Sequence, residues 1–301
     1  MTATKPKSKL AGKNPADAKP SRAKLLLYGP PGTGKTWGAL SFPRCLYIDT
    51  EAGANLPPYT RRLSAGGGSY IGQEDGALDF DFVIGQFAAL ASERHEFETV
   101  VVDSISKLFN TSIAAEAERL GSRNQFGADK KPALRSMARL MQWVQRVDCN
   151  VVFLAHEKPV WGDVNGQRAE IGRGPDVDAK LEYELNLVLQ LVKTPAARQA
   201  ITRKSRLEGF QHGQAFAWEF AEFQTRYAAS LEGAAQIEPL VQPAMLAEIG
   251  ALIALVKTPE EDLDKMKLRA GVSDFAELTA DKATKLRDWL QKKITDSLAV
   301  A

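Results

Sequence analysis

The sequence predicts an α/β fold with a largely parallel central sheet, and three observations support that prediction. A phosphate-binding loop lies between an apolar segment and a helical segment near the N-terminus. Apolar segments at 25–28, 45–49, 99–103 and 150–155 alternate with stretches of helical pattern. The segment 99–103 is apolar and β-branched, which is typical of a strand covered on both faces.

The phosphate-binding loop follows the pattern G-x-x-x-x-G-K-[ST]. It comprises Gly29, Pro30, Pro31, Gly32, Thr33, Gly34, Lys35 and Thr36. Its glycines let the backbone turn its N–H groups toward phosphate oxygens. Lys35 would reach the β- and γ-phosphates, Thr36 would bind Mg²⁺, and Trp37 begins the following helix. The loop therefore predicts a nucleotide site, with ATP and Mg²⁺ as the expected ligands.

The other elements follow in chain order. Residues 54–79 contain Pro57-Pro58 and three consecutive glycines and are expected to form loops. Helices are expected at 80–94, 106–120 and 132–147, a mobile stretch at 121–131, a glycine-rich loop at 157–178, and strands at 185–192, 199–204 and 216–220. Strands that alternate with helices favour a parallel sheet.

Composition narrows the class of protein. The chain has 301 residues, 44% of them hydrophobic and 25% charged, as in soluble globular proteins. No apolar run is long enough for a transmembrane helix, and no secretory signal is recognisable, so no membrane partner is expected. Cys45 and Cys149 lie in apolar runs, which indicates buried thiols in a reducing cytoplasm rather than a metal site.

The chain divides into three predicted parts. Residues 1–20 form a basic, proline-containing arm that is expected to be disordered, either to bind nucleic acid or to aid solubility. Residues 21–232 form the α/β core. Residues 233–301 form a helical module of three expected helices. The first spans 243–257, the second follows the capping box at 258–261 and ends at Gly271, and the third runs from Thr279 through Trp289. This module is either a structural or oligomerisation appendage or a DNA- or partner-binding unit.

Polar residues end three of the predicted strands. Glu51 follows the strand 45–49, and a P-loop ATPase needs such a carboxylate to orient or deprotonate the attacking water. Asp103 ends the strand 99–103 as an expected Mg²⁺ ligand, and Ser104 rather than glutamate comes next. His156 ends the strand 150–155, where a sensor of the γ-phosphate is expected.

These segments together resemble the RecA/RadA-type ATPases over residues 21–225. The resemblance implies a RecA-like P-loop core, with Glu51 as catalytic carboxylate and His156 as sensor in place of the usual glutamine. It also implies that Lys204 and Arg206 reach a neighbouring subunit's γ-phosphate, whereas their structural alternative is a solvated basic patch. For His156, the alternative is a hydrogen-bonded strand end.

The chain looks most like the phage-encoded minimal RecA-like proteins. This resemblance rests on its small size, its helical C-terminus, the segment Ser41-Phe42-Pro43 and the segment 46–51. That resemblance implies recombination or single-strand annealing, self-association into a ring or filament, single-stranded DNA as partner, and the host cytoplasm as location. A single-strand-binding protein is a further candidate partner.

DNA contacts are expected in two loops, at 121–131 and 157–178, and on the helix between them. On that helix, basic side chains form one stripe and Leu134, Met137, Met141 and Val144 lie on the opposite, packing side. The candidate contacts are Arg123, Lys130, Lys131, Arg135, Arg139, Arg146, Trp161, Arg168 and Arg173. A basic stripe with an exposed aromatic fits single-strand binding, and a solvated helix face is the structural alternative.

Two other functions compete with a DNA-binding ATPase. An AAA+-like motor or helicase loader shares the loop wording but normally places its base directly after the strand aspartate, where this chain has Ser104. A nucleotide switch in a complex without DNA would bind ATP and barely hydrolyse it. Stimulation of hydrolysis by DNA would separate the first function from the last.

Overall fold

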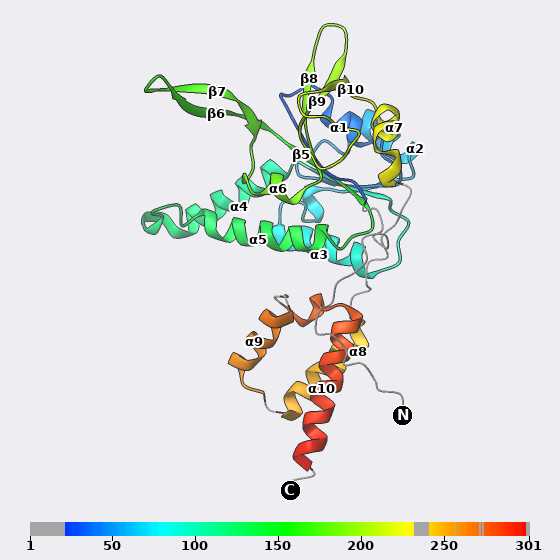
Figure 1. Ribbon diagram of the computed structural model, residues 1–301, viewed down its shortest axis with the longest axis vertical. Helices are drawn as coiled ribbons and strands as arrows, with labels where there is room; N and C mark the ends of the chain where they lie inside the picture. Colours follow the sequence, from blue (N-terminus) through cyan, green and yellow to red (C-terminus); the bar gives the residue numbers. More distant parts are fainter. Residues whose placement is uncertain (1–21, 232–240, 257, 271, 273, 299–301) are drawn as a thin grey trace, which may run out of the picture.

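An eight-stranded sheet forms the centre of the protein in the computed structural model (Figure 1). The structure describes residues 22–231, 241–256, 258–270, 272 and 274–298. The sheet strands, in chain order, are β1 Lys24–Tyr28, β2 Cys45–Asp49, β3 Ser69–Ile71, β4 Thr99–Asp103, β5 Asn150–Ala155, β8 Leu187–Lys193, β9 Arg198–Ser205 and β10 Ala215–Ala217. Their spatial order is β10-β9-β8-β1-β5-β4-β2-β3. The strands from β8 to β3 in this order run parallel, and β9 pairs antiparallel with both β8 and β10, so the sheet is mostly parallel and the predicted fold class is confirmed.

Helices cover both faces of this sheet (Figure 1). They are α1 Lys35–Ala39, α2 Pro57–Ala65, α3 Phe80–Ser92, α4 Ile105–Leu120, α5 Lys130–Val144, α6 Leu181–Glu184 and α7 Phe220–Leu231. Alternate residues of β1 point to opposite faces, so Leu26 packs with α3, α4 and α5, while Leu27 packs with α1, α2 and α7. Every residue of β1, β2, β4 and β5 is buried, as their continuous apolar sequence predicts.

The segment 54–79 is more ordered than expected. Pro57-Pro58 opens helix α2 instead of a loop, because a fixed φ and a missing N–H cost nothing in the first helical turn. Gly68 then lets the chain turn beside β2, since a Cβ there would lie 2.5 Å from the Cys45 carbonyl oxygen. Strand β3 follows and pairs with β2 at the sheet edge, so the expectation of loops throughout this segment is wrong.

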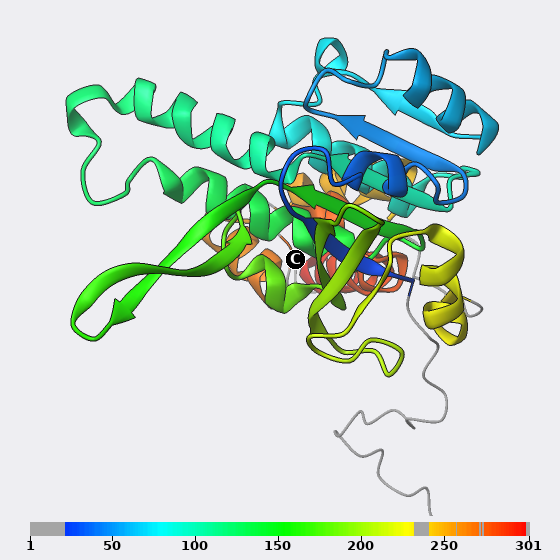
Figure 2. The same ribbon diagram turned by 90° about the horizontal axis from the view of Figure 1, so that it is seen from above.

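A two-stranded ribbon replaces the loop expected at 157–178. It consists of β6 Glu157–Val164 and β7 Gln167–Pro175, and it projects from the core on the same side as the α4–α5 connection (Figures 1 and 2). Asn165 and Gly166 turn the chain with φ of 55° and 80°. Asn-Gly favours such a two-residue hairpin turn, so the signal was present in the sequence.

Two smaller differences concern single elements. The strand expected at 216–220 ends at Ala217, and Phe220 begins α7. Leu134, placed by the sequence on the packing side of its helix, is instead 38% exposed, whereas Met137, Met141 and Val144 are buried as expected. The side chains of Cys45 and Cys149 are also buried.

The C-terminal helices pack around an apolar cluster of their own. They are α8 Pro243–Val256, α9 Glu260–Ala270 and α10 Ala280–Leu298, so the last helix runs beyond Trp289. Ile249 of α8 and Leu290 of α10 are buried in this cluster. The predicted arm at 1–20, the boundary at 232/233 and the helix end at Gly271 lie outside the described residues. Among the helices that the structure describes, none has the length and apolarity needed to cross a bilayer.

Lys24 is a buried lysine at the start of β1. Its ammonium nitrogen donates to the carbonyl oxygens of Val147 at 2.8 Å and Cys149 at 2.7 Å. Burial lowers the pKa of Lys24 from 10.5 to about 7. The folded protein therefore releases this proton at a much lower pH than the unfolded chain.

The buried lysine predicts a rise in stability with pH. Between pH 7 and 10.5 the unfolded chain binds more protons at Lys24, so the free energy of unfolding should increase by up to about 1.4 kcal/mol per pH unit. The variant Lys24→Met should lack this increment, whatever its absolute stability. Urea unfolding at pH 7, 8 and 9 measures the difference in slope. The exposed Lys193→Met is the control, and equal slopes for wild type and Lys24→Met would contradict the prediction.

Candidate nucleotide-binding and hydrolysis site

The phosphate-binding loop leaves the carboxyl end of β1 and enters α1. Gly29, Gly32 and Gly34 adopt φ of 151°, 78° and 88°, values that side chains disfavour. A Cβ on Gly29 would also lie 2.3 Å from the Leu191 carbonyl oxygen of β8. Glycine at these positions lets the loop curl against the sheet, so that it can present backbone N–H groups to an anion.

Lys35 lies over this loop. Its ammonium nitrogen donates to the carbonyl oxygens of Gly29 at 2.8 Å and Pro30 at 3.0 Å. Burial lowers the pKa of Lys35, and the Asp103 carboxylate opposes that shift. The position suits a lysine that turns from loop carbonyls to phosphate oxygens.

Thr36 and Asp103 form the pair of oxygens that fits Mg²⁺. The Thr36 hydroxyl donates to Asp103 Oδ2 at 2.6 Å, and the Tyr47 hydroxyl donates to the same oxygen at 2.9 Å. Asp103 is only 5% exposed, and burial raises its pKa against those two hydrogen bonds. A hydroxyl and a carboxylate are hard oxygen ligands of the kind that Mg²⁺ prefers. Held by Thr36 and Asp103, Mg²⁺ would supply positive charge that offsets the charge of a phosphate group.

Glu51 lies at the centre of a second polar cluster. Its Oε1 accepts a hydrogen bond from the Ser104 hydroxyl at 2.5 Å and lies 3.0 Å from His156 Nε2. Its Oε2 lies 3.9 Å from the Lys107 ammonium. These residues follow β2, β4 and β5, whose parallel carboxyl ends meet at one edge of the sheet. The structure thus brings Glu51 and His156 together.

Two residues missed by the sequence reasoning hold Glu51 in place. The Asp49 carboxylate accepts from the backbone N–H groups of Glu51 at 2.9 Å and Ala54 at 2.6 Å. The Thr50 hydroxyl accepts from the Ser104 N–H at 2.6 Å and donates to the Ser104 carbonyl at 3.1 Å, across a cis Asp103–Ser104 peptide bond. Both residues stand within the Ile-Asp-x-Glu segment, so their proximity to Glu51 was a usable signal.

A cavity of about 660 Å³ connects the loop to the Glu51 cluster. Lys35, Thr36, Asp103, Glu51 and His156 all line it, and so do Glu157 and Arg173 from the base of the ribbon. The volume lies within the usual range of small-molecule sites. Five of the predicted nucleotide, metal and catalytic residues therefore surround one space: Lys35, Thr36, Asp103, Glu51 and His156.

A second cavity of about 630 Å³ lies on the other flank of the loop, beside Trp37. The Arg62 guanidinium carbon lies 4.2 Å from the centre of the Trp37 ring. Trp218 donates to the Gly34 carbonyl at 3.3 Å, and the Arg198 side chain packs against Gly34. Arg62, Arg198 and Trp218 come from distant segments, so no local pattern could have marked them.

Lys204 and Arg206 lie at the opposite edge of the sheet from the loop. Lys204 pairs with Val188 in β8, and its ammonium bonds the Leu185 carbonyl. Arg206 donates to the Tyr183 carbonyl at 2.5 Å. Since the loop follows the far end of β1, the structure does not bring this pair to Lys35 within one chain.

The basic residues around α5 do not form one continuous exposed stripe as predicted, because some are exposed and others bond neighbouring elements. Arg123, Lys130, Lys131 and Arg135 are exposed. Arg139 instead bonds Asp81 of α3 at 2.8 Å, and Arg146 donates to the Glu277 carbonyl of the C-terminal helices at 2.8 Å. Phe126 is fully exposed at the α4–α5 connection, an aromatic that the sequence reasoning passed over.

The ribbon carries the remaining predicted contacts. Trp161 is 52% exposed, and the Arg168 guanidinium lies 5.5 Å from the centre of its ring. Arg173 forms an ion pair with Glu170 at 2.7 Å. Trp161 and Arg168 therefore lie on the projecting part of the ribbon, whereas Arg173 lies at its base.

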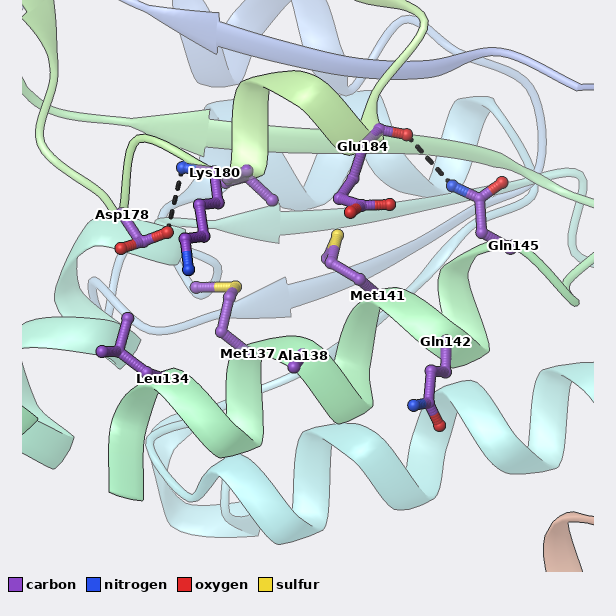
Figure 3. Close-up of a pocket in the computed structure, with 10 residues that line it drawn as sticks. Leu134, Met137, Ala138, Met141, Gln142, Gln145, Asp178, Lys180 and Glu184 are labelled. Carbon is purple, nitrogen blue, oxygen red and sulfur yellow. Dashed lines mark hydrogen bonds between the residues drawn. The ribbon is translucent and has the colours of Figure 1, made fainter. Parts of the chain in front are cut away.

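A third cavity, of about 430 Å³, separates α5 from α6. Figure 3 shows Met137 and Met141 of α5 pointing toward the segment that carries Lys180 and Glu184. Its lining is largely apolar, and it lies apart from the loop and the Glu51 cluster. It therefore adds nothing to the nucleotide site.

Comparisons with known proteins place the chain in one family. No curated protein matches the chain. The crystal structure of the RadB recombinase is similar over 65% of this chain and 86% of that chain, with 22% identity and a TM-score of 0.42. A KaiC-like protein from the hyperthermophilic archaeon Pyrococcus horikoshii is similar over 65% of this chain and 84% of that chain, with 14% identity and a TM-score of 0.40. Residues 21–216 match the family described as an AAA domain, so the chain belongs to this family.

Proposed function

We propose that the protein hydrolyses ATP with Mg²⁺, binds single-stranded DNA and assembles with further copies for recombination or strand annealing. The observation that carries the hydrolytic part is the single cavity lined by Lys35, Thr36, Asp103, Glu51 and His156. Binding, metal-holding and proton-accepting groups surround one space there, as phosphoryl transfer to water requires.

The loop residues bind the nucleotide in this proposal. Backbone N–H groups of 29–36 hold the phosphates, and the Lys35 ammonium exchanges loop carbonyls for β- and γ-phosphate oxygens. Thr36 and Asp103 would hold Mg²⁺, which would supply positive charge beside the phosphates. The second cavity, beside Trp37, suits the base, since an aromatic ring and the Arg62 guanidinium offer stacking surfaces.

Glu51 directs the hydrolytic step. It orients a water against the γ-phosphorus and takes a proton from it as the new P–O bond forms. The bond from the γ-phosphorus to the bridging oxygen breaks, and ADP leaves with that oxygen. His156 and Ser104 fix the orientation of Glu51 through contacts of 3.0 and 2.5 Å to Oε1.

Two projecting elements support DNA binding. The α4–α5 connection and the β6–β7 ribbon extend from the same side of the core (Figures 1 and 2). Each carries an exposed aromatic beside basic residues, with Phe126 near Lys130 on one and Trp161 near Arg168 on the other. Stacking surfaces combined with cations are the means by which proteins hold single strands without sequence preference.

The position of Lys204 and Arg206 supports self-association. The pair lies at the sheet edge far from its own loop, so it can reach a γ-phosphate only in another copy. An arginine supplied in trans stabilises transition-state charge. Such a head-to-tail contact closes into a ring or continues as a filament.

A slowly hydrolysing nucleotide switch is the second candidate function. It is favoured by the contacts on Glu51, whose two oxygens already engage Ser104, His156 and Lys107. These contacts occupy the carboxylate oxygens that would otherwise face the attacking water. Rapid turnover that increases with single-stranded DNA would exclude the switch, whereas turnover unaffected by DNA would favour it.

Two substitutions test the nucleotide site. Lys35→Ala should abolish tight ATP binding because the phosphate charge loses its partner. Glu51→Gln should bind ATP normally and reduce turnover about 10²-fold or more, the usual scale for acid–base help. Nucleotide titration and phosphate release measure the two effects. Glu157→Gln is the matched control in the same cavity, and if it were the slow variant while Glu51→Gln stayed fast, Glu51 would not be the base.

The trans pair is tested by mixing. Lys204→Ala and Arg206→Ala should spare ATP binding and reduce hydrolysis, by up to about 10³-fold for a true arginine finger. Each defect lies on the opposite side of a subunit boundary from Glu51→Gln. Mixtures of the two kinds of variant should therefore recover activity that neither has alone. Failure of every mixture, with a protein that stays monomeric with ATP, would argue against trans catalysis.

The DNA site is tested by salt dependence. For single strands, the slope of log K against log salt is about −0.7 per phosphate neutralised. Replacing Arg135 and Arg139 together with alanine should weaken binding and flatten that slope by roughly one unit or more. Asp81→Asn is the control, since it frees Arg139 from its ion pair without removing the cation. Fluorescence anisotropy with labelled oligonucleotides at several salt concentrations measures both quantities.

Aromatic contacts should behave differently in the same assay. Trp161→Ala and Phe126→Ala should each cost about 1–3 kcal/mol of binding if the rings stack on bases, and should leave the salt slope unchanged. If the arginine pair alters neither affinity nor slope, the basic residues of α5 form a solvated face. The DNA site would then lie in the N-terminal arm or the C-terminal helices.

A further inference from the structure

Arg173 occupies a position that DNA binding does not explain. It lies at the base of the ribbon, where its side chain lines the same cavity as Lys35 and Glu51. Its carbonyl oxygen lies 3.5 Å from the hydroxyl of Tyr28, the residue before the phosphate-binding loop. The backbone of Arg173 is thus tied to the start of the loop.

Contacts between the two strands also fix the base of the ribbon, where the end of β7 meets the start of β6. Asp176 donates its backbone N–H to the His156 carbonyl at 2.8 Å, and its carboxylate accepts from Asn110 at 2.9 Å. Lys158 of β6 forms an ion pair with the same carboxylate at 3.1 Å. These contacts hold the backbone of Arg173 beside the cavity, while its side chain is half exposed.

The charge of the cavity favours a second cation at the nucleotide. Three carboxylates line it, from Glu51, Asp103 and Glu157, and its lysine and arginine lining consists of Lys35 and Arg173. A triphosphate adds negative charge to this space. The guanidinium fork of arginine matches phosphate oxygens in a bidentate manner.

The present partner of Arg173 is easily exchanged. The ion pair with Glu170 joins two partly exposed side chains at 2.7 Å, and such pairs contribute little to stability. A terminal phosphate carries more charge than a carboxylate. Moving the guanidinium from Glu170 to the nucleotide therefore costs little free energy.

We propose that Arg173 is a same-chain ligand of the terminal phosphate of bound ATP, released from Glu170 when the nucleotide enters. The proposal rests on the nucleotide function above and deepens it. Arg173 then distinguishes ATP from ADP, since only ATP presents a γ-phosphate near the Glu51 side of the cavity. It acts within one chain, unlike Lys204 and Arg206.

Binding measurements test this assignment directly. Dissociation constants for Mg²⁺–ADP and for the Mg²⁺ complex of the non-hydrolysable analogue AMP-PNP are measured by calorimetry on the full chain. Arg173→Gln should weaken AMP-PNP binding about 10- to 100-fold and leave ADP binding unchanged, the scale of lost hydrogen bonds to a charged group. Arg173→Lys should recover part of the loss. Glu170→Gln should strengthen AMP-PNP binding by up to about fivefold, because the competing ion pair is gone.

Arg94→Gln is the matched control, with the same charge change at an exposed arginine outside the cavity lining, and it should alter neither constant. Equal losses of ADP and AMP-PNP affinity in Arg173→Gln would overturn the proposal, as would unchanged affinity for both. If Arg173→Gln weakened DNA binding but left AMP-PNP affinity intact, the proposal would be wrong and Arg173 would be a DNA contact. If folded wild-type protein bound neither nucleotide, the proposed function itself would fail, a result distinguishable from the failure of Arg173 alone.

Discussion

Parallel pairing of β1, β5, β4 and β2 is the constraint on which the candidate site depends. The register places Asp49 beside Asp103 and Asp103 beside Leu154, so the segments that follow these strands emerge next to one another. Glu51, Ser104 and His156 are then neighbours without any long side chain having to reach across the fold. A slip of one residue in β2 would turn Asp49 to the other face of the sheet and remove the two hydrogen bonds that hold Glu51.

Burial of charged groups makes the site receptive to a ligand that carries both signs of charge. Asp103 is nearly inaccessible, and burial raises its pKa, while burial lowers the pKa of Lys35. Each group is thus poorly solvated in its charged form. A magnesium nucleotide would supply a cation to Asp103 and phosphate oxygens to Lys35, and so would compensate both groups at once. Burial disfavours the charged form of each group alone, and it therefore favours a ligand that carries both a cation and an anion.

The sequence predicted correctly those features that depend on consecutive residues. Eight consecutive residues of the loop, the buried strands and the carboxylates at their ends could be read directly, because continuous apolar runs specify buried strands and glycines specify a tight loop. It failed where a signal had two meanings. Pro57-Pro58 was read as a break although proline also starts helices, and the glycines of 157–178 masked the Asn165-Gly166 turn of a hairpin. Arg62, Arg198 and Trp218 could not have been found, since only the tertiary fold brings them to the loop.

Ser104 explains why the proposed base is Glu51 rather than the residue after Asp103. Its hydroxyl donates to Glu51 at 2.5 Å and accepts from the Lys107 N–H at 3.1 Å, where it caps α4. Only a short side chain can do both in a position that is 1% exposed. A glutamate at 104 would lose the cap and bring a second negative charge against Glu51. The arrangement with a base directly after the strand aspartate and the arrangement seen here therefore exclude each other physically, and this chain has the residues of the second.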